Sequence, residues 1–361
     1  MRPRVIAFYL PQFYPTPEND EWWEPGFTEW TNVAKAKPLF KGHYQPRIPR
    51  DLGFYDLRVP ETREKQAQLA REAGIEGFCY WHYWFGNGKR LLADVFREVV
   101  ETGKPDFPFC LCWANHSWYQ KTWDPKKPNK LLIEQTYPGL DDYKAHFMEM
   151  LPAFKDKRYM KTSDGKLIFG VFDFDYFHDF SLFKNTWNKL ANDNGLDGFE
   201  FFAFVQGEKR LKNYKQGSFD RVVYDALLDT YESYSPYSLH RFKNSVKVRI
   251  GLPVHLASYG DYVSIAIDRF RKLPEFTPCI DPMFDHSPRS ANRGIILYNN
   301  SPRLWGKLCN KVSELVMGGN DKDHLIFIKA WNEWGEGNYL EPDSRYGKKY
   351  IEEAGKVFIK Y

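Results

Sequence analysis

Two glutamates three residues apart, Glu333 and Glu336, are the residues of this sequence best suited to acid–base chemistry. They follow an apolar segment, residues 325–330, and lie in a Gly-rich stretch between tryptophans, where burial should raise the pKa of a carboxyl group. A protonated carboxyl beside an ionised one is what making or breaking a glycosidic bond requires, because the leaving oxygen needs a proton and the anomeric centre needs a base or nucleophile. The alternative is that both side chains cap a helix or face solvent. The preceding apolar segment, the tryptophans and the glycines favour the catalytic interpretation.

Further polar and aromatic side chains stand directly after other apolar segments, where they could bind a sugar. These candidates are Tyr9, Gln12, Trp81, His82, Trp113, Asn115, His116, Asp173, Tyr224, Asn332, Trp334 and Glu341, together with Asp285 and Arg289 in a loop before the last helix. Each has a structural alternative: Tyr224 could belong to the core, and Asp285 and Arg289 could form a surface ion pair of little energetic value.

Aromatic residues are unusually abundant, at 18% of the chain, with 29 Phe, 23 Tyr and 12 Trp. Rings at strand ends stack on the apolar faces of sugars, and rings elsewhere fill a core. Both interpretations apply to Trp22, Trp23, Trp30, Trp81, Trp84, Trp113, Trp118, Trp123 and Trp334.

The elements that must position these residues alternate between short apolar segments and longer polar ones of helical character. We predict eight strands, at residues 5–10, 77–81, 109–113, 167–172, 200–205, 221–224, 277–280 and 325–330, and helices at residues 61–73, 91–102, 141–154, 182–194, 262–272 and 302–317. Several of the strands are continuously apolar, as expected where both faces of a parallel sheet are covered.

This alternation predicts an α/β protein with a single (β/α)8 TIM barrel and long βα loops, and a doubly wound sheet is the alternative. The position of the polar residues favours the barrel, because barrel active sites are built at the carboxyl ends of the strands. Residues 15–49 and 118–138 are too long for ordinary connections and should form walls of the site. No linker divides the chain, so we expect one catalytic domain over residues 1–361.

Composition and charge exclude several classes of function. Lys and Arg number 51 and Asp and Glu 47, a net charge of +4, which argues against a dedicated nucleic-acid binder. No apolar run approaches the roughly 18–20 residues of a membrane helix. The apolar run of residues 5–10 is too short for an export signal, and the five cysteines lack a CxxC pair. These observations predict a cytoplasmic protein.

The sequence offers little for a metal or nucleotide. Asp173 and Asp175 form an Asp-x-Asp pattern of the kind that holds a divalent cation in many sugar transferases, but three residues are a weak signal. His43, His82 and His116 lack metal-ligand spacing. Gly-rich stretches do not match a phosphate-binding loop. We therefore predict no metal and no cofactor.

Residues 331–337, WNEWGEG, followed by residues 340–342, LEP, resemble the signature of glycoside hydrolase family 99, the endo-α-mannosidase barrels. The longer stretch 333–343 and the opening residues 7–14, AFYLPQFY, resemble more closely the WbsX-type branch, which is often labelled glycosyltransferase and associated with O-antigen and other polysaccharide loci. Blocks at residues 77–85, 167–173, 219–224 and 285–289 extend the resemblance over nearly the whole chain.

The resemblance implies a retaining reaction without an enzyme-bound sugar ester. Glu333 would deprotonate the sugar 2-hydroxyl, which attacks its own anomeric carbon to form a 1,2-anhydro sugar, while Glu336 protonates the leaving oxygen. A 2-hydroxyl trans to the leaving group, as in α-manno or α-rhamno sugars, is already placed for this attack. The resemblance also implies that Asp173 binds a sugar hydroxyl, that Tyr224 lies over the anomeric centre and that Arg289 donates to substrate oxygens.

The sequence departs from the mannosidase pattern at two places. Gly335 replaces a histidine, and Asn115 and His116 stand where a carboxylate is expected after the third strand, which implies different sugar contacts. We thus expect a glycoside hydrolase acting on an α-linked oligosaccharide or polysaccharide. A glycosyltransferase or transglycosidase of surface-polysaccharide assembly and a non-catalytic glycan-binding barrel are the alternatives, and the sequence leaves the oligomeric state open.

Overall fold

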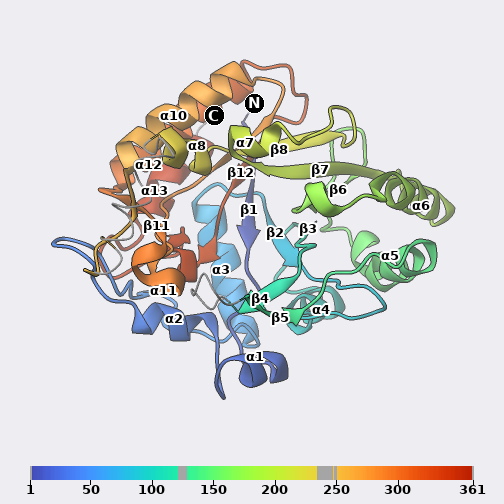
Figure 1. Cartoon of the computed structure of the whole chain (residues 1–361). Coiled ribbons are helices and arrows are strands. Elements are labelled where there is room, and N and C mark those ends of the chain that lie inside the picture. The colour runs from blue at the N-terminus through green and yellow to red at the C-terminus, as the bar shows by residue number, and fades with distance from the viewer. Residues whose placement is uncertain (1, 121–127, 234–246, 248–249, 360–361) are drawn as a thin grey trace.

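Eight parallel strands close into a barrel at the centre of the molecule in the computed structural model, which describes residues 2–120, 128–233, 247 and 250–359 (Figure 1). In chain order the barrel strands are β1 (Arg4–Tyr9), β2 (Gly77–His82), β3 (Phe109–Trp113), β6 (Leu167–Val171), β7 (Phe199–Gln206), β8 (Arg221–Asp225), β10 (Thr277–Ile280) and β12 (Leu325–Ile328). Each strand pairs with the next one in this order, and β1 pairs with β12 to close the ring.

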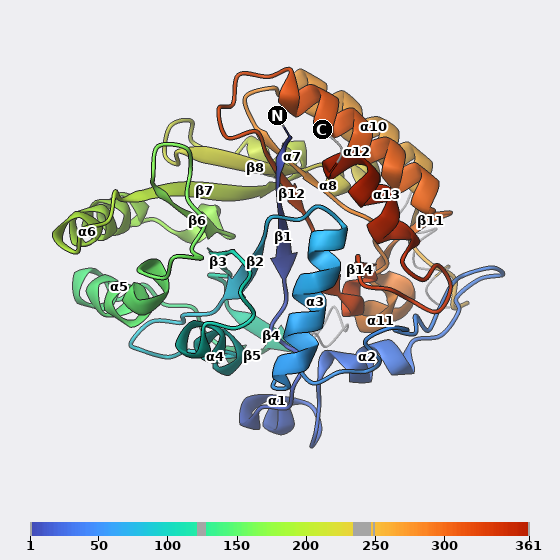
Figure 2. The same cartoon turned by 180° about the vertical axis from the view of Figure 1, so that it is seen from behind.

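Helices surround the barrel on its outer side (Figure 2). The longer ones are α3 (Pro60–Glu72), α4 (Asp94–Thr102), α5 (Leu140–Phe154), α6 (Phe180–Asp193), α10 (Tyr259–Lys272), α12 (Pro302–Met317) and α13 (Lys349–Phe358), and the shorter α7 (Gly207–Leu211) and α8 (Leu227–Ser233) follow β7 and β8. This arrangement confirms the predicted (β/α)8 barrel. All eight strands and six helices lie within three residues of the predicted bounds, whereas α7, α8 and α13 were not predicted.

Aromatic side chains fill the barrel interior. Phe8 stacks on Trp81 with ring centroids 4.6 Å apart and contacts Phe204 at 5.2 Å, and Phe202 packs against Phe327 at 5.0 Å. Gly170 leaves room for these rings, because a Cβ atom there would lie 2.2 Å from the ring of Phe202. Part of the large aromatic content thus serves barrel packing.

A charged network closes the amino-terminal end of the barrel. Arg221 at the start of β8 binds Glu200 of β7, Asp321 at 2.7 Å and Asp323 at 3.2 Å. Arg4 at the start of β1 pairs with Glu76 at 2.8 Å just before β2. This end of a (β/α)8 barrel contributes to stability, and function resides at the other end.

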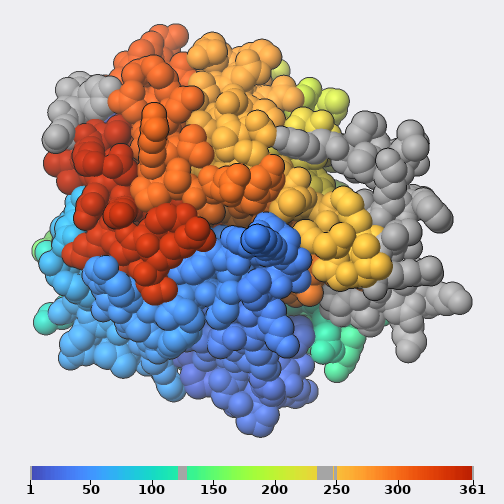
Figure 3. Space-filling model, turned by 90° about the vertical axis from the view of Figure 1, so that its left-hand side faces the viewer, coloured from blue at the N-terminus to red at the C-terminus, as the bar shows by residue number. Residues whose placement is uncertain are grey.

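The carboxyl-terminal end carries short helices and three small sheets. They are α1 (Pro17–Trp22), α2 (Glu29–Lys35), α11 (Ser287–Ser290), three 3-10 turns, η1 (Phe174–Tyr176), η2 (Ala291–Arg293) and η3 (Trp334–Glu336), and the strand pairs β4 (Trp118–Gln120) with β5 (Lys130–Ile133), β9 (His255–Ser258) with β11 (Ile295–Tyr298), and β13 (Asn332–Glu333) with β14 (Asn338–Tyr339). Residues 48–50 and 342–344, far apart in the sequence, pair here, since Arg50 N donates to Pro342 O at 2.9 Å and Ser344 N to Ile48 O at 2.8 Å. Figure 3 shows these segments side by side on one face.

Candidate active site

A pocket of about 740 Å³ opens at the carboxyl-terminal end of the barrel. Both long segments predicted as walls contribute to it, the first through α1 and α2 and the second through β4 and β5. Its lining comprises Leu10, Gln12, Asn19, Trp22, Trp23, Phe27, Glu29, Asn32, Trp81, Tyr83, Ala114, His116, Ser117, Trp118, Tyr119, Leu132, Phe172, Gln206, Leu227, Leu228, Phe284, His286, Arg289, Ser290, Ile295, Lys329, Glu333 and Glu336. An aromatic pocket with few charged groups is the usual form of a small-molecule or sugar site.

Glu333 lies on the short strand β13, which follows β12 and projects over the barrel mouth. The side chain is 5% exposed, and its Oε1 accepts a hydrogen bond from Trp81 Nε1 at 2.8 Å. Burial, and then the neighbouring carboxylate of Glu336, raise the pKa of Glu333 to about 7. This carboxyl is therefore ready to exchange a proton near neutral pH.

Glu336 lies one 3-10 turn later, in η3, and is surrounded by cations. Lys329 Nζ lies 2.8 Å from Oε2, and Arg289 donates to Oε1 at 2.7 Å. Burial alone would raise the pKa of this carboxyl, but Lys329 and then Arg289 outweigh burial and hold the pKa well below its usual range. The pocket thus contains two carboxyls of opposite protonation tendency.

Two more carboxylates, Asp225 and Asp281, interact with the Lys329 ammonium. Asp225 at the end of β8 and Asp281 just after β10 are both fully buried. Burial raises the pKa of both groups, and their mutual repulsion adds to the effect at Asp281. Burial would lower the pKa of the Lys329 ammonium, but Glu336 and Glu333, together with these two carboxylates, raise it.

The structure brings six of the sequence candidates into the pocket lining: Gln12, Trp81, His116, Arg289, Glu333 and Glu336. Burial and the nearby Arg210 lower the pKa of His116 to about 4, so this imidazole is neutral near pH 7. Of the candidate tryptophans, Trp22, Trp23 and Trp118 also line the pocket. Trp123 lies outside the described residues.

Tyr9, Asn332, Trp334 and Glu341 lie behind the pocket wall, among buried hydrogen bonds. Glu341 accepts from Gln66 Nε2 at 2.6 Å, from the Tyr55 hydroxyl at 2.9 Å and from Trp334 Nε1 at 2.6 Å, and Tyr9 donates to the same Gln66 at 2.7 Å. Asn332 bonds both backbone groups of Leu10, at 2.7 and 3.0 Å. Burial raises the pKa of Glu341 to about 7. These contacts hold the loop that carries Glu333 and Glu336.

His82 and Trp113 point away from the pocket, toward α5. His82 Nε2 lies 2.6 Å from His146 Nε2, and Trp113 Nε1 donates to Trp84 O at 2.9 Å. Tyr224 likewise points outward, where its hydroxyl donates to Asp229 of α8 at 2.5 Å. Successive residues of a strand face opposite sides, so Trp81 enters the pocket and its neighbour His82 cannot.

Asn115, Asp173 and Asp285 serve as anchors of loops outside the lining. Asn115 bonds the backbone of Asp173 at 2.7 and 2.9 Å. Asp173 and Asp175 share Arg210, at 2.5 and 3.1 Å, so this arginine pairs with both carboxylates and holds them together. Asp285 accepts from His43 at 2.8 Å and Gln45 at 2.7 Å. Burial would raise the pKa of Asp285, but His43 and Arg47 hold it well below its usual range.

Sequence reasoning missed Glu29 and Lys329 in the lining. Glu29 lies on α2, far from any strand end, so no strand-end rule could find it. Lys329 follows β12 directly and carries the signal that selected its neighbours, but it was read as part of the apolar segment.

Two further observations bear on ligands. Among the residues that the structure describes, no group of three or more His, Cys, Asp or Glu could hold a metal ion, and no helix is long and apolar enough to cross a membrane.

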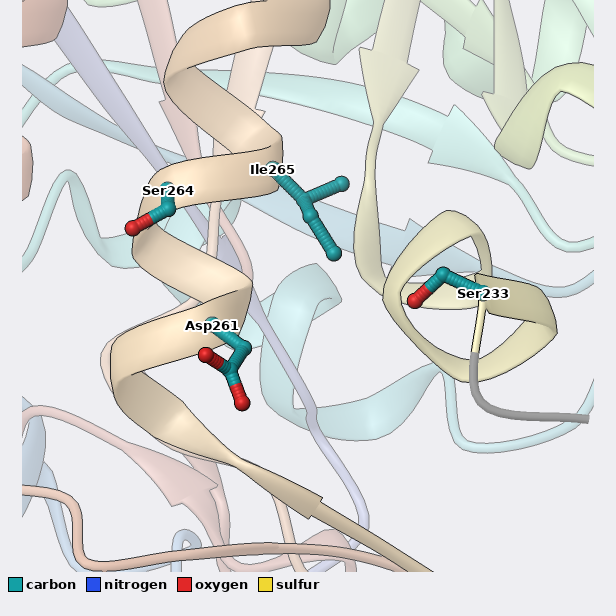
Figure 4. Close-up of a pocket in the computed structure, with 4 residues that line it drawn as sticks. All are labelled: Ser233, Asp261, Ser264 and Ile265. Carbon is teal, nitrogen blue, oxygen red and sulfur yellow. The ribbon is translucent and has the colours of Figure 1, made fainter.

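A second hollow, of about 220 Å³, lies beside the end of α8 and along α10, lined by Ser233, Asp261, Ser264 and Ile265 (Figure 4). With a single carboxylate in this lining, it has no acid–base pair.

Comparison with known proteins gives the following matches. The family model described as "Glycosyltransferase WbsX" matches residues 5–354. Two curated relatives from strains of Xanthomonas campestris pv. campestris, both called "Uncharacterized protein WxcX", are 35% identical over 352 residues, which is 96% of this chain and 48% of the relative. The chain thus spans about half the length of the curated relatives it matches.

Solved structures show the same fold at low sequence identity. A "Glycoside hydrolase-like protein" superimposes with a TM-score of 0.61 and 13% identity, covering 99% of this chain and 94% of the other. The GH99 endo-α-mannosidase of Bacteroides thetaiotaomicron superimposes with a TM-score of 0.54 and 13% identity, covering 99% of this chain and 97% of the other.

Proposed function

The chain belongs to the glycosyltransferase WbsX family of carbohydrate-active barrels, and from this premise we propose that it cleaves an α-linked glycan as a retaining glycoside hydrolase. The observation that carries the proposal is the pair Glu333 and Glu336 in one pocket wall, one tending to keep a proton and the other to lose it. Opposite protonation of two pocket carboxyls is the condition for acid–base cleavage of a glycosidic bond.

The charges in the pocket favour one allocation of roles. Glu333 keeps its proton near neutral pH, so it is the acid that protonates the leaving oxygen. Glu336 is held as a carboxylate by Lys329 and Arg289, so it is the base. This allocation is the reverse of the one implied by family resemblance, in which Glu336 is the acid.

The proposed reaction conserves the anomeric configuration in two steps. Glu336 takes the proton of the sugar 2-hydroxyl, the 2-oxygen attacks the anomeric carbon, and Glu333 gives its proton to the departing oxygen, leaving a 1,2-anhydro sugar. Water then attacks the anomeric carbon and loses a proton to Glu333, while Glu336 returns its proton to the 2-oxygen. The geometry suits sugars whose 2-hydroxyl is trans to the leaving group, as in α-manno and α-rhamno glycans.

Glutamine variants with two kinds of substrate test both the pair and the allocation. α-Mannosyl and α-rhamnosyl fluorides need no acid because fluoride leaves unprotonated, whereas unactivated α-manno- and α-rhamno-oligosaccharides do. Because kcat/KM reports the first step alone, we expect Glu333→Gln to lower kcat/KM about 100-fold or more on the oligosaccharides and little on the fluorides. Glu336→Gln should lower kcat/KM on both kinds of substrate. NMR would follow the anomeric configuration of the first product, with Glu314→Gln on the surface of α12 as control.

Each other result has a definite meaning. A large fall of kcat/KM on the fluorides in Glu333→Gln, with Glu336→Gln unchanged on them, would restore the allocation implied by resemblance. Wild-type rates in both variants would contradict the carboxylate pair.

The family description favours a glycosyltransferase as the second candidate function. A transferase fed by a nucleotide sugar must bind a diphosphate, and so it should be stabilised by nucleotide. Thermal unfolding with and without nucleoside diphosphates separates the two candidates, because we expect the hydrolase to show no nucleotide-dependent shift.

A further inference from the structure

Glu29 is a third carboxylate in the pocket, and neither the sequence motif nor the proposed reaction assigns it a task. It occupies the first turn of α2, which Thr28 caps through a hydrogen bond from Trp30 N to Thr28 Oγ1. The residue is only 4% exposed, yet it lies in the lining of the pocket. A charge in such a place requires a partner.

The partner of Glu29 is Arg289, which pairs with both Glu29 and Glu336. Nε and one terminal nitrogen of Arg289 both lie 3.0 Å from Glu29 Oε2, and the other terminal nitrogen donates to Glu336 at 2.7 Å. The guanidinium is thus bonded to carboxylates through all three of its nitrogens. Lys329, the other Lys or Arg side chain among the described lining residues, is paired with Glu336.

Gly335 makes the contact between Glu29 and Arg289 sterically feasible. A Cβ atom at position 335 would lie 2.1 Å from Glu29 Oε2 and 2.9 Å from Arg289 Nε. Any other residue at this position would therefore displace the carboxylate from the guanidinium.

We propose that Glu29 determines specificity, by binding Arg289 so completely that the pocket selects uncharged sugars over sugar acids. The inference rests on the proposed function, since it presumes that a sugar occupies the pocket. A carboxylate on the ligand must compete with Glu29 for Arg289 and must approach Glu29 and Glu336, which are like charges. An uncharged sugar only exchanges hydrogen bonds with these groups.

The test compares two ligands that differ only at carbon 6, methyl α-D-mannopyranoside and its uronic acid, methyl α-D-mannopyranosiduronate. NMR titration gives a dissociation constant for each ligand. We expect the wild-type protein to bind the neutral sugar at least 10-fold more tightly than the acid. Glu29→Gln removes the charge that Glu29 places on Arg289 and leaves the contact with Glu336. We therefore expect the ratio of the two dissociation constants to shift about 10-fold in favour of the acid, or about 1.4 kcal/mol.

A second variant, Gly335→Ala, weakens the contact between Glu29 and Arg289 differently, because the added methyl group pushes the Glu29 carboxylate aside without removing it. The ratio of the two dissociation constants should therefore shift in favour of the acid here too. The matched control is Glu24→Gln, which removes an exposed carboxylate of the neighbouring segment that is paired with Lys35 and should leave the ratio unchanged. Near-UV circular dichroism and urea unfolding establish that each variant is folded.

The outcomes separate the two claims. Equal binding of neutral sugar and acid by the wild-type protein, or a ratio that changes less than twofold in both folded variants, would overturn the assignment of Glu29 and leave the proposed function intact. Binding of neither ligand by any variant would contradict the proposed function and the inference together.

Discussion

Lys329 decides which of the two pocket carboxyls keeps a proton. Its ammonium lies 2.8 Å from Glu336, and an opposite charge at this distance lowers a carboxyl pKa by about 1–3 units. The same ammonium also lowers the pKa of Glu333, but burial and the Glu336 charge outweigh it there. Lys329, with Arg289, therefore separates the pKa values of two carboxyls that are three residues apart.

We predict that Lys329→Met raises the pH at which the enzyme becomes active by one unit or more. In the wild-type protein kcat/KM should fall as pH rises through about 7, where Glu333 loses its proton, and should stay high well below the usual range of a glutamate, where Glu336 remains ionised. Without the ammonium, Glu336 binds a proton at higher pH and the acidic limb moves upward. The pH profile of kcat/KM measures the shift.

Lys311→Met is the control for this change, since Lys311 forms an exposed ion pair within α12. An acidic limb that stays in place in Lys329→Met would show that Lys329 does not set the charge of Glu336.

At the scale of elements, a pair of buried histidines joins strand β2 to helix α5. The rings of His82 and His146 stack with centroids 4.9 Å apart, and His146 also lies 4.5 Å from the ring of Trp84. Burial holds the pKa of both imidazoles well below the usual value, and Arg90 lowers both further. Both side chains are therefore neutral in the folded protein near pH 7.

This contact predicts acid sensitivity. Below about pH 6.5 the unfolded chain binds protons at these two imidazoles while the folded protein does not, so stability falls as pH decreases from that point. The loss should be roughly 1 kcal/mol per pH unit for each imidazole. Urea unfolding at pH 7, 6 and 5 measures it.

The variant His146→Gln keeps a donor for His82 but removes one titrating group, so we expect the pH dependence of unfolding to flatten by roughly 1 kcal/mol per pH unit. His178→Gln, at an exposed position, is the control. A slope identical to that of the wild-type protein would show that the buried pair does not cause the acid sensitivity.

At the scale of the whole molecule, we expect the amino-terminal end of the barrel to contribute stability and the carboxyl-terminal end to carry the reaction. The pocket and its charges lie at the carboxyl-terminal end, and the network of Arg221 with Glu200, Asp321 and Asp323 lies at the other end. Removing one partner of a buried charged network costs about 3–5 kcal/mol, because the remaining charges are left without compensation.

We therefore predict that Arg221→Met lowers the free energy of unfolding by about 3–5 kcal/mol and leaves kcat/KM on the glycosyl fluoride within twofold of the wild-type value. Lys189→Met, which breaks an exposed ion pair within α6, should cost about 0.5 kcal/mol or less. Urea unfolding and fluoride assays on the same samples separate the two effects, and a large loss of activity in folded Arg221→Met would contradict the division.

The sequence alone determined the barrel and predicted the end of it at which the candidate site lies. Continuous apolar segments such as residues 109–113 and 277–280 coincide with strands β3 and β10, because a strand covered on both faces must be apolar throughout. The motif around Glu333 and Glu336 follows the last strand, and the carboxyl ends of all strands meet at one mouth. The extent of the catalytic domain and the cytoplasmic location stay predictions.

Tertiary structure decided which candidates face the pocket. Tyr9, His82 and Tyr224 stand at strand ends as Trp81 does, yet they point outward to Gln66, His146 and Asp229. Position along a strand gives the end at which a side chain lies, but direction depends on the register of the pleat and on partners that packing supplies.

Tertiary structure also decided the charges of the site. Glu29 meets Arg289 across 260 residues of chain, in a space that Gly335 leaves empty. The sequence contains all three residues, but a local pattern carries no information about distances between remote loops. The pKa of a carboxyl depends on those distances, because burial and Coulomb interactions act through space and not along the chain.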